Sequence, residues 1–343
     1  MILVTGASGA IGSALVRRLV AGDQPVRALV HNPAKAAARL ADIRDRIEIV
    51  AGDVTRPETL RSALDGARAV VHLVAIAMEN GRATYEAVNT QGTVNLVNAA
   101  QAAGVRRFVN MSQNGADSAL PYPFLRSKGK AQDYVAASGL DWTAFRPSVV
   151  WGPHDEFANV QARLIRLTPL IFPVVGDGKA RFQPVYVGDL VEAVARALDD
   201  DATLGRELGI GGPEVLTYEE IVRRVLAALG ARRALVHVPI PLLRPVVAIM
   251  ARLPNPPVTP SLLDLLKIDN VVERNALVEH FGIAARPFAP EHLDYMRRFT
   301  AMGSLKRFFG RETPDDTQGA RCAWTTSTTS PATISTVRLF HAR

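Results

Sequence analysis

The 343-residue chain contains few cysteines and few aromatic side chains, and it has no long uninterrupted apolar run. Its single cysteine, Cys322, excludes an internal disulfide framework and any cysteine-based metal site, and it fits a reducing compartment. The seven histidines show no metal-ligand spacing, and the acidic run at 199–201 is typical of a solvated helix end. We therefore predict that the protein holds no metal.

No stretch reaches the roughly 18 consecutive apolar residues of a membrane-spanning helix. The nearest stretch, from Val236 to Leu253, is interrupted by three prolines and by Arg244, and it favours a buried or interfacial helix over a membrane-surface element. Strand-forming residues begin at Ile2, which leaves no room for a signal or transit peptide ahead of the fold. We expect a cytoplasmic protein whose contact with the inner face of a membrane is at most peripheral.

Aromatic residues make up only 6% of the chain, and its net charge of +7 is not gathered into one basic stripe. Three of these charges fall in residues 303–343, and the other four are scattered over residues 1–302. Without a basic surface interleaved with stacking aromatics, the sequence disfavours nucleic acid as a partner. Periodicity stops beyond Arg311, and the Thr/Ser-rich run at 325–330 predicts that residues 303–343 form a disordered tail.

Short β-branched runs alternate with helical patterns through the first half of the chain. These runs lack apolar/polar alternation, which indicates that helices cover both faces of the sheet. We predict an α/β fold with a Rossmann-type doubly wound parallel sheet over residues 1–150, completed by about 184–205. The expected strands are 2–5, 26–31, 47–50, 69–74, 108–111 and 142–146, and the expected helices are 11–21, 57–64, 83–103 and 127–137.

After Arg146 the pattern changes, because prolines and glycines interrupt the chain repeatedly. Amphipathic helices are then expected at 187–198, 218–229 and 260–266. They predict a smaller, mostly helical region for substrate or partner over residues 151–302. This region would pack over the carboxyl ends of the strands, where open α/β sheets bind their ligands.

A glycine-rich turn follows the first strand and reads Thr5-Gly6-Ala7-Ser8-Gly9-Ala10-Ile11-Gly12. Such a turn lets backbone amides approach a pyrophosphate at the positive end of a helix dipole. Gly6 would permit the tight turn, Gly9 the close approach and Gly12 the packing of helix against strand. We expect a nicotinamide dinucleotide here, with a merely tight turn as the alternative. The expected contacts are Gly6, Ser8, Gly9, Ala10, Ile11 and Gly12.

NAD-binding proteins place a carboxylate about 20 residues further on, where it binds the ribose 2′-hydroxyl. This chain has Val30-His31-Asn32 at that place, with no acid. Nothing there repels a 2′-phosphate, while Arg27, His31 and Lys35 could lie near it, so we favour NADP(H) over NAD(H). A solvent-facing strand end is the alternative for His31.

Asp53 and Val54 follow the third predicted strand. Asp53 is placed to meet the adenine through its side chain and backbone. Equally, it could be a turn or cap residue before the helix that begins at Pro57.

Several strings along the first half of the chain support the same fold. They are Thr5-Gly6-x-x-Gly9-x-x-Gly12, Gly52-Asp53-Val54, His72-Leu73-Val74-Ala75, Asn89-Thr90-Gln91-Gly92-Thr93-x-Asn95-Leu96 and Arg146-Pro147-Ser148-x-x-x-Gly152-Pro153. Together they resemble the extended and atypical short-chain dehydrogenase/reductase superfamily. The resemblance implies further cofactor contacts from Val74, Ala75, Asn89, Lys128, Pro147, Ser148 and Val149.

Two later features resemble one subgroup of this superfamily. The string Gln183-Pro184-Val185-Tyr186-Val187-Gly188-Asp189-Leu190 and the proline-rich region 239–270 are similar to the NAD(P)H-binding accessory subunit of respiratory complex I and its bacterial relatives. That similarity implies a respiratory complex or another protein as a partner.

In active members of the superfamily, a Tyr-x-x-x-Lys pair and a Ser or Thr carry out the proton transfer. Lys128 matches the lysine, and Ser112, at the end of the fifth strand, is the best match for the serine. Phe124 occupies the tyrosine position. Because phenylalanine has no proton to give, and positioned acid–base catalysis is worth ~10²–10⁴-fold in rate, the usual chemistry is in doubt.

Other groups nearby are weaker candidates for the missing proton donor. Tyr122 lies two residues before Phe124 and would need its loop to swing inward, whereas Tyr134 lies on another helical face than Lys128 and is expected to pack. The polar cluster at 154–156 follows Gly152-Pro153 near the expected mouth of the site, and a solvated loop is favoured over catalysis there.

Two functions follow from these patterns. The first is an NAD(P)(H)-binding protein without turnover, in a structural or sensing role. The second is an active NAD(P)-dependent oxidoreductase, or a sugar-nucleotide epimerase or dehydratase.

Overall fold

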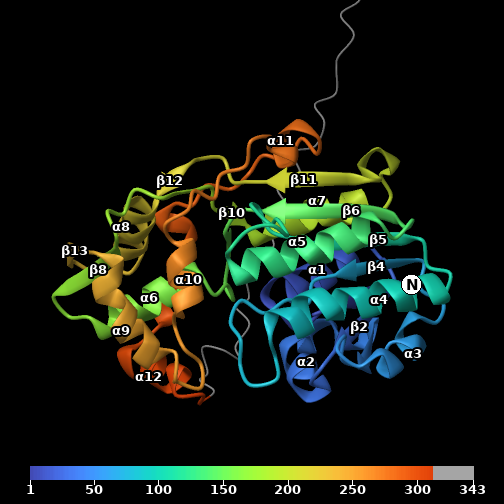
Figure 1. Ribbon diagram of the computed structural model, residues 1–343, viewed down its shortest axis with the longest axis horizontal. Helices are drawn as coiled ribbons and strands as arrows, with labels where there is room; N and C mark the ends of the chain where they lie inside the picture. The colour runs from blue at the N-terminus through green and yellow to red at the C-terminus, as the bar shows by residue number, and fades with distance from the viewer. Residues whose placement is uncertain (312–343) are drawn as a thin grey trace, which may run out of the picture.

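A seven-stranded sheet forms the centre of one lobe of the computed structural model, which describes residues 1–311 (Figure 1). The sheet order is β11-β6-β5-β4-β1-β2-β3, and its strand pairs are all parallel. The predicted doubly wound α/β fold is confirmed. Cys322 and residues 312–343 of the expected tail lie outside the described residues, but residues 303–308 do not form a disordered tail, because they belong to a helix with a buried face. The strands are β1 (Ile2–Thr5), β2 (Val26–Val30), β3 (Ile47–Ala51), β4 (Ala69–His72), β5 (Arg107–Met111), β6 (Asp141–Pro147) and β11 (Arg206–Ile210).

The chain reverses its direction of travel across the sheet between β1 and β4. In open α/β sheets, ligands bind in the crevice outside the carboxyl ends of the strands at such a reversal. The glycine turn that follows β1 and the segment that follows β4 therefore border the expected ligand site.

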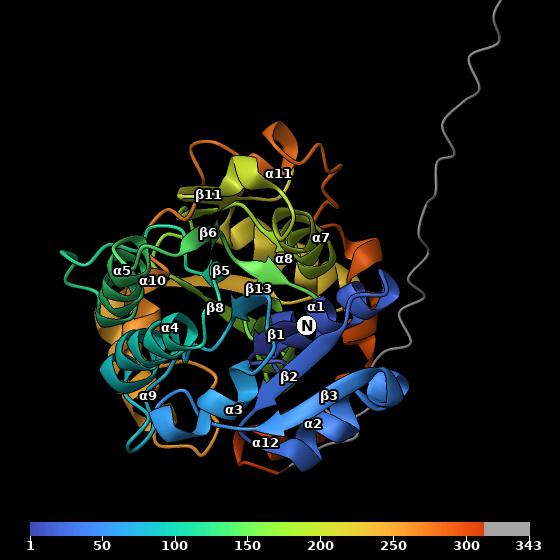
Figure 2. The same ribbon diagram turned by 90° about the vertical axis from the view of Figure 1, so that its right-hand side faces the viewer.

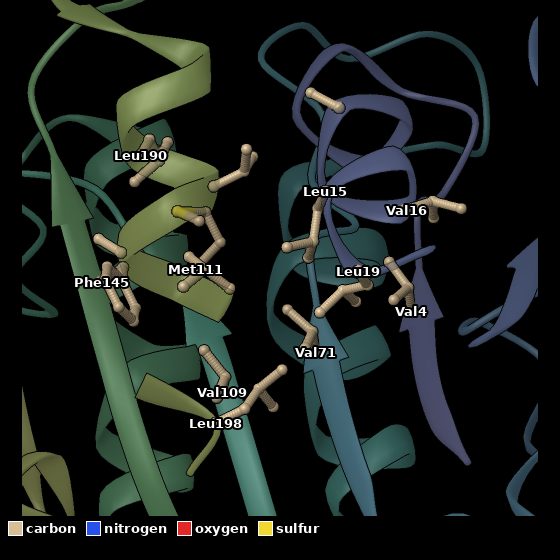
Figure 3. Close-up of a cluster of buried hydrophobic side chains, with 14 of the residues drawn as sticks. Val4, Leu15, Val16, Leu19, Val71, Val109, Met111, Phe145, Leu190 and Leu198 are labelled. Atoms are coloured by element: carbon tan, nitrogen blue, oxygen red, sulfur yellow. The ribbon is translucent and has the colours of Figure 1, made fainter. Parts of the chain in front are cut away.

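Helices cover both faces of the sheet (Figures 1 and 2). One face carries α1 (Ala10–Ala21), α2 (Pro33–Arg39) and α7 (Val187–Ala197), and the other carries α3 (Arg61–Leu64), α4 (Gly92–Ala102) and α5 (Pro123–Ala136). The core between helices α1 and α7 and the sheet contains Leu15 and Leu19 of α1, Leu190 of α7 and Phe145 of β6 (Figure 3). Each such burial contributes about 1.5–3 kcal/mol, so α1 is held firmly behind the turn.

Several element boundaries differ from those predicted. β2 and β4 end at Val30 and His72, and the helix predicted over 83–103 begins as a π-helical segment, Glu86–Gln91, before α4. Helix α2 was not predicted, although Asn32 caps it by accepting the Lys35 N–H at 3.0 Å and Pro33 opens it. The cap draws the chain out of the sheet at His31, which shortens β2.

The second lobe packs around its own core, in which Trp151, Tyr218, Phe288 and Phe299 are buried. Three two-stranded sheets of the described residues border it: β7 (Val150–Trp151) with β10 (Val185–Tyr186), β8 (Ile171–Val175) with β13 (Ala234–Val238), and β9 (Arg181–Phe182) with β12 (Leu216–Thr217). The longer helices are α6 (Ala158–Leu167), α8 (Tyr218–Ala228), α9 (Ile240–Met250), α10 (Pro260–Leu265) and α12 (Ala301–Phe308).

The chain crosses between the lobes more than once. Helix α7 packs on the sheet lobe, β11 extends the sheet beyond the expected 184–205 segment, and α11 (Ala276–Glu279) returns late in the chain. Leu277 and Phe281 from this last passage are buried in the core of the sheet lobe. Neither lobe is therefore one continuous stretch of sequence.

The apolar stretch 236–253 is not the buried helix that its composition favours. It contains the end of β13 and then α9, of which only Val247 is buried. Pro239 and Pro241 end the strand and begin the helix, where their missing N–H groups cost little. Among the described helices, none is both long enough and apolar enough to cross a bilayer.

Candidate dinucleotide-binding site

The turn between β1 and α1 has room only for glycine at two of its positions. Gly6 adopts φ +66°, and a Cβ there would lie 3.2 Å from the backbone of Leu73 and Val74. A Cβ on Gly12 would lie 2.1 Å from the carbonyl oxygen of Gly6. The Gly9 N–H donates to that same oxygen at 2.9 Å and closes the turn. Larger residues would therefore force the turn open.

The first turn of α1 is open to an anion. Gly9 is its N-cap, and no described side chain caps the helix or places an acid in its first turn. The free backbone N–H groups and the positive end of the dipole remain available, and Gly9 is exposed while Ser8 and Ala10 are partly exposed. These residues fit the pyrophosphate of a dinucleotide. A turn that served only to reverse the chain would not need an uncapped and exposed helix start.

The end of β2 carries no acid, but Asp53 lies close by. His31 is 85% exposed, and its Nε2 is 3.9 Å from Oδ2 of Asp53. Burial raises the pKa of Asp53, but hydrogen bonds from Thr55 and the nearby charges of His31 and Arg56 outweigh it and hold that pKa below its ordinary value. The Asp53 Oδ1 accepts the Thr55 N–H and hydroxyl at 2.8 Å each, so the side chain forms a turn and its contact with adenine stays a prediction.

The structure corrects the expected place of Arg27. This residue lies near the amino end of β2, where its guanidinium donates to Glu48 at 2.7 Å and to the carbonyl oxygen of Ala63 at 2.9 Å. It is therefore at the wrong end of the strand for a 2′-phosphate. His31 and Lys35, both exposed, remain at the carboxyl end.

A buried histidine joins β1, β4 and α4 directly behind the turn. The Thr93 hydroxyl donates to the Asn89 carbonyl at 2.7 Å, so its oxygen accepts from Nε2 of His72 at 3.0 Å. Nδ1 of His72 then accepts from the Thr5 hydroxyl at 2.8 Å. Burial and the nearby charge of Lys128 lower the pKa of His72 to about 3, so the ring is a neutral connector.

Asn89 holds the segment after β4 against α5. Its Oδ1 accepts the Ile76 N–H at 2.8 Å, and its Nδ2 donates to the Ile76 carbonyl and to the Ser127 hydroxyl, both at 3.1 Å. Asn89 is only 1% exposed. We therefore expect its influence on a bound nucleotide to pass through the neighbouring Val74 and Ala75, of which Val74 lies beside Gly6.

Lys128 and Ser112 lie together at the carboxyl end of β5. The Lys128 ammonium donates to the Met111 carbonyl at 2.5 Å, and burial lowers its pKa to about 8. Ser112 follows directly, is 3% exposed, and has a hydroxyl without a hydrogen-bond partner among the described residues. A buried amine beside a buried unpartnered hydroxyl fits the ribose and nicotinamide end of the cofactor.

Phe124 lies one helical turn before Lys128 and packs edge-on against Tyr85, with ring centroids 5.9 Å apart. Tyr85, which sequence reasoning missed, donates its hydroxyl to the Ala77 carbonyl at 2.7 Å. Tyr122 is the half-buried N-cap residue of α5. Tyr134 is exposed and donates its hydroxyl to Asn98 at 2.6 Å, so it forms a surface hydrogen bond rather than the packing contact expected of it.

The segment after β6 joins the two lobes. The Ser148 hydroxyl donates to the Asn270 carbonyl at 2.6 Å and accepts the Gln183 N–H at 3.1 Å. The Val149 carbonyl accepts the Val185 N–H at 2.9 Å. Because the Ser148 side chain is buried and its only proton is donated to Asn270, we expect any cofactor contact of Pro147, Ser148 and Val149 to come from the backbone.

Asp155 is not part of a solvated loop. It is 9% exposed and accepts the N–H groups of Gly152, Phe157 and Asn159, which makes it a local cap for α6. Burial raises its pKa to about 6 against the effect of these hydrogen bonds. Glu156 is exposed, as expected. Within residues 1–311, His, Cys, Asp and Glu side chains form no group of three or more that could hold a metal ion.

Comparison with known proteins agrees with this geometry. A family model described as NAD(P)H-binding matches residues 6–160, and one for the NAD dependent epimerase/dehydratase family matches residues 127–211. The UDP-glucose 4-epimerase of Thermus thermophilus, solved in complex with NAD, is 26% identical with a TM-score of 0.58, covering 69% of this chain and 86% of that one.

Two curated relatives cover most of the chain. The mitochondrial NADH dehydrogenase [ubiquinone] 1 alpha subcomplex subunit 9 of Arabidopsis thaliana is 26% identical over 80% of this chain and 71% of its own. A 3 beta-hydroxysteroid dehydrogenase/Delta 5-->4-isomerase of Mycobacterium tuberculosis is 30% identical over 89% of this chain and 88% of its own. This protein therefore belongs to the extended short-chain dehydrogenase/reductase superfamily, as an NAD(P)-binding member.

Proposed function

We propose that this protein binds NADP(H) at the Gly6–Gly12 turn and uses the bound nucleotide in a structural or sensing role, without the tyrosine-dependent chemistry of its superfamily. The observation that carries the proposal is Phe124. The resemblance to the superfamily aligns Phe124 with the donor tyrosine of active members, and the phenol packed against it, Tyr85, already donates its hydroxyl to Ala77. Neither ring presents a free acidic proton beside Lys128.

The bound cofactor would supply a hydride donor or acceptor. The chain supplies the binding groups: amides of the turn for the pyrophosphate, and Lys128 and Ser112 for the opposite end. Lys128 is 6% exposed and has a pKa of about 8, so it carries substantial charge at neutral pH and can donate to a ribose hydroxyl. These groups position a nucleotide but do not include the missing proton donor.

The preference for NADP(H) rests on the end of β2. His31 is exposed, Lys35 lies on the adjoining helix, and the position that binds the NAD ribose carries no carboxylate. Titration with NADPH and NADH tests this preference. We expect tighter binding of NADPH, and clearly tighter binding of NADH would contradict it.

A protein partner extends the proposal. The relationship to a complex I subunit supports a partner in a respiratory complex or another assembly. Ligand binding stabilises the folded state by mass action, by about 2.7 kcal/mol at a concentration 100 times Kd, so nucleotide and partner can be linked without turnover. A reducing, cytoplasmic setting with peripheral membrane contact fits this role.

A second function is favoured by one observation: the buried Ser112 hydroxyl has no hydrogen-bond partner among residues 1–311, and it directly follows Met111, whose carbonyl accepts from Lys128. This function is that of an active oxidoreductase, or a sugar-nucleotide epimerase or dehydratase, that takes its proton from Tyr122 or water. Oxidation of NADPH with a panel of ketosteroids, other carbonyl compounds and sugar nucleotides separates the two functions. Turnover that disappears in Lys128→Ala would establish the enzyme and overturn the first proposal.

A further inference from the structure

One helix of the second lobe, α9, is apolar on nearly every side and yet barely buried. Arg244 is its only charged residue, and Val247 its only buried one. Leu242, Val246 and Ile249 recur at helical spacing and form one stripe, in which they are 67%, 54% and 67% exposed. A surface helix normally turns such a stripe toward a core. An exposed stripe of this kind marks a contact surface.

A second helix, α12, carries a similar stripe. Met302, Leu305 and Phe309 share one face and are 62%, 43% and 54% exposed, while Ser304 and Phe308 on the other face are buried. The inner face packs against α6 in the second lobe. Exposure of the outer stripe is therefore not a sign of a loosely held helix.

The two helices are tied together. Asn255, just beyond α9, donates its backbone N–H to the Phe308 carbonyl and its side-chain amide to the Arg307 carbonyl, both at 3.1 Å. Figures 1 and 2 both place α9 and α12 at the lower edge of the molecule, far from α11. We call this edge the α9–α12 surface.

The positive charge of the protein lies in the same part of the chain. Residues 230–311 contain twelve Lys and Arg against six Asp and Glu, whereas residues 1–229 contain twenty-five against twenty-four. Arg252, just after α9, and Lys306, beside the α12 stripe, are both exposed. Neither forms an ion pair with any residue in the described part of the chain. Exposed apolar side chains and unpaired cations thus occur on one surface.

We propose that the α9–α12 surface binds the face of an anionic lipid bilayer. The apolar stripes would enter the boundary between headgroups and acyl chains, and Arg252 and Lys306 would meet the anionic headgroups. A second copy of this chain fits less well, because it would bring two positively charged surfaces together. The helices lie on the bilayer rather than cross it, since α9 has only 11 residues.

The test is co-sedimentation of the full-length protein with vesicles of phosphatidylcholine alone and with vesicles that also contain phosphatidylglycerol. We expect binding to the anionic vesicles and little to the neutral ones. The pair Leu242→Asp and Ile249→Asp is expected to weaken that binding roughly 100-fold. Val278→Asp is the matched control, because Val278 is 52% exposed on α11 at the far side of the molecule and should have no effect.

The charge contribution has its own variant. Arg252→Gln with Lys306→Gln should weaken binding to anionic vesicles about 20-fold and leave binding to neutral vesicles unchanged. Wild-type protein that fails to sediment with either vesicle, or a double aspartate variant that binds like wild type, would overturn the proposal. So would a wild-type dimer that the aspartate pair dissociates while vesicle binding stays absent, because a second copy would then cover the surface.

Nucleotide binding separates this inference from the proposed function. All the variants leave the Gly6–Gly12 turn intact, so each should bind NADPH like wild type, which also verifies folding. If wild type fails to bind NADPH, the proposed function fails while the vesicle result stands.

Discussion

The glycine turn after β1 and the first turns of α5 border the same edge of the sheet, and we propose that only the glycine turn keeps all the groups that its task requires. The turn needs backbone amides and the absence of side chains, and Gly6 and Gly12 provide both. In the function we propose, proton transfer at the α5 region would need one hydroxyl, which Phe124 cannot supply. Binding of a dinucleotide is thus distributed over many backbone groups, whereas proton transfer depends on a single atom. A relative of many enzymes can therefore keep the first and lose the second.

Buried polar side chains connect these two regions. His72 links Thr5 at the turn to Thr93 on α4, and Asn89 links the segment after β4 to Ser127 on α5. Each network is internally satisfied, so it holds the two regions in register without taking part in chemistry.

The largest effect is expected from Phe124→Tyr, which restores the missing hydroxyl beside Lys128. If only the proton donor separates this site from an active one, NADPH oxidation with a suitable carbonyl substrate should rise by ~10²–10⁴-fold. Initial rates of absorbance loss measure it. Phe124→Leu is the control and should show no gain. Equal rates in wild type and Phe124→Tyr would mean that the α5 region lacks more than a hydroxyl.

Stability at alkaline pH tests the burial of Lys128. Burial lowers its pKa from 10.5 to about 8, so between these values the unfolded chain holds more protons than the folded one. Stability should therefore rise with pH across this window, by about 3 kcal/mol in total from this residue. Urea unfolding of the nucleotide-free protein at several pH values measures the rise. Lys128→Met should lack it, and parallel profiles for the two proteins would show that Lys128 is solvated.

The turn is tested by Gly12→Ala. The added Cβ would overlap the Gly6 carbonyl oxygen at 2.1 Å, so the turn must shift. A shift of this size should weaken NADPH binding about 100-fold in a fluorescence titration. Gly139→Ala is the control, because a Cβ on Gly139 would meet open space, although Gly139, unlike Gly12, has a positive φ of +72°. Unchanged affinity in Gly12→Ala would place the nucleotide elsewhere.

The smallest effect is expected at the end of β2. His31→Asp introduces the carboxylate that NAD-binding relatives use, and it should weaken NADPH binding about tenfold while NADH binding is maintained or improved. Competitive titration of both nucleotides measures the ratio. If the ratio does not change, His31 is only the solvent-facing strand end that the sequence also allowed.

Local sequence was enough to predict the turn and the parallel sheet, because Gly6, Gly9 and Gly12 lie in one short segment and the strands are short β-branched runs. The roles of Lys128 and Ser112 came from the resemblance to the superfamily and stay predictions, although the structure brings the Lys128 ammonium to the Met111 carbonyl, directly before Ser112. The contacts of Tyr85 with Phe124 and of His72 with Thr5 and Thr93 could not be predicted, because they join side chains from separate elements. Hydrophobic periodicity could not predict the burial of α9. A helix that is apolar on nearly every side gives no sign of which face is buried.

The central claim is that the protein binds the nucleotide without using it in tyrosine-type chemistry. The most direct measurement combines NADPH affinity and NADPH oxidation in one wild-type sample, with carbonyl and sugar-nucleotide substrates present. We predict saturable binding, tighter than that of NADH, and no oxidation above the rate without protein. Multiple turnovers that Lys128→Ala abolishes, or no saturable binding at all, would contradict the account.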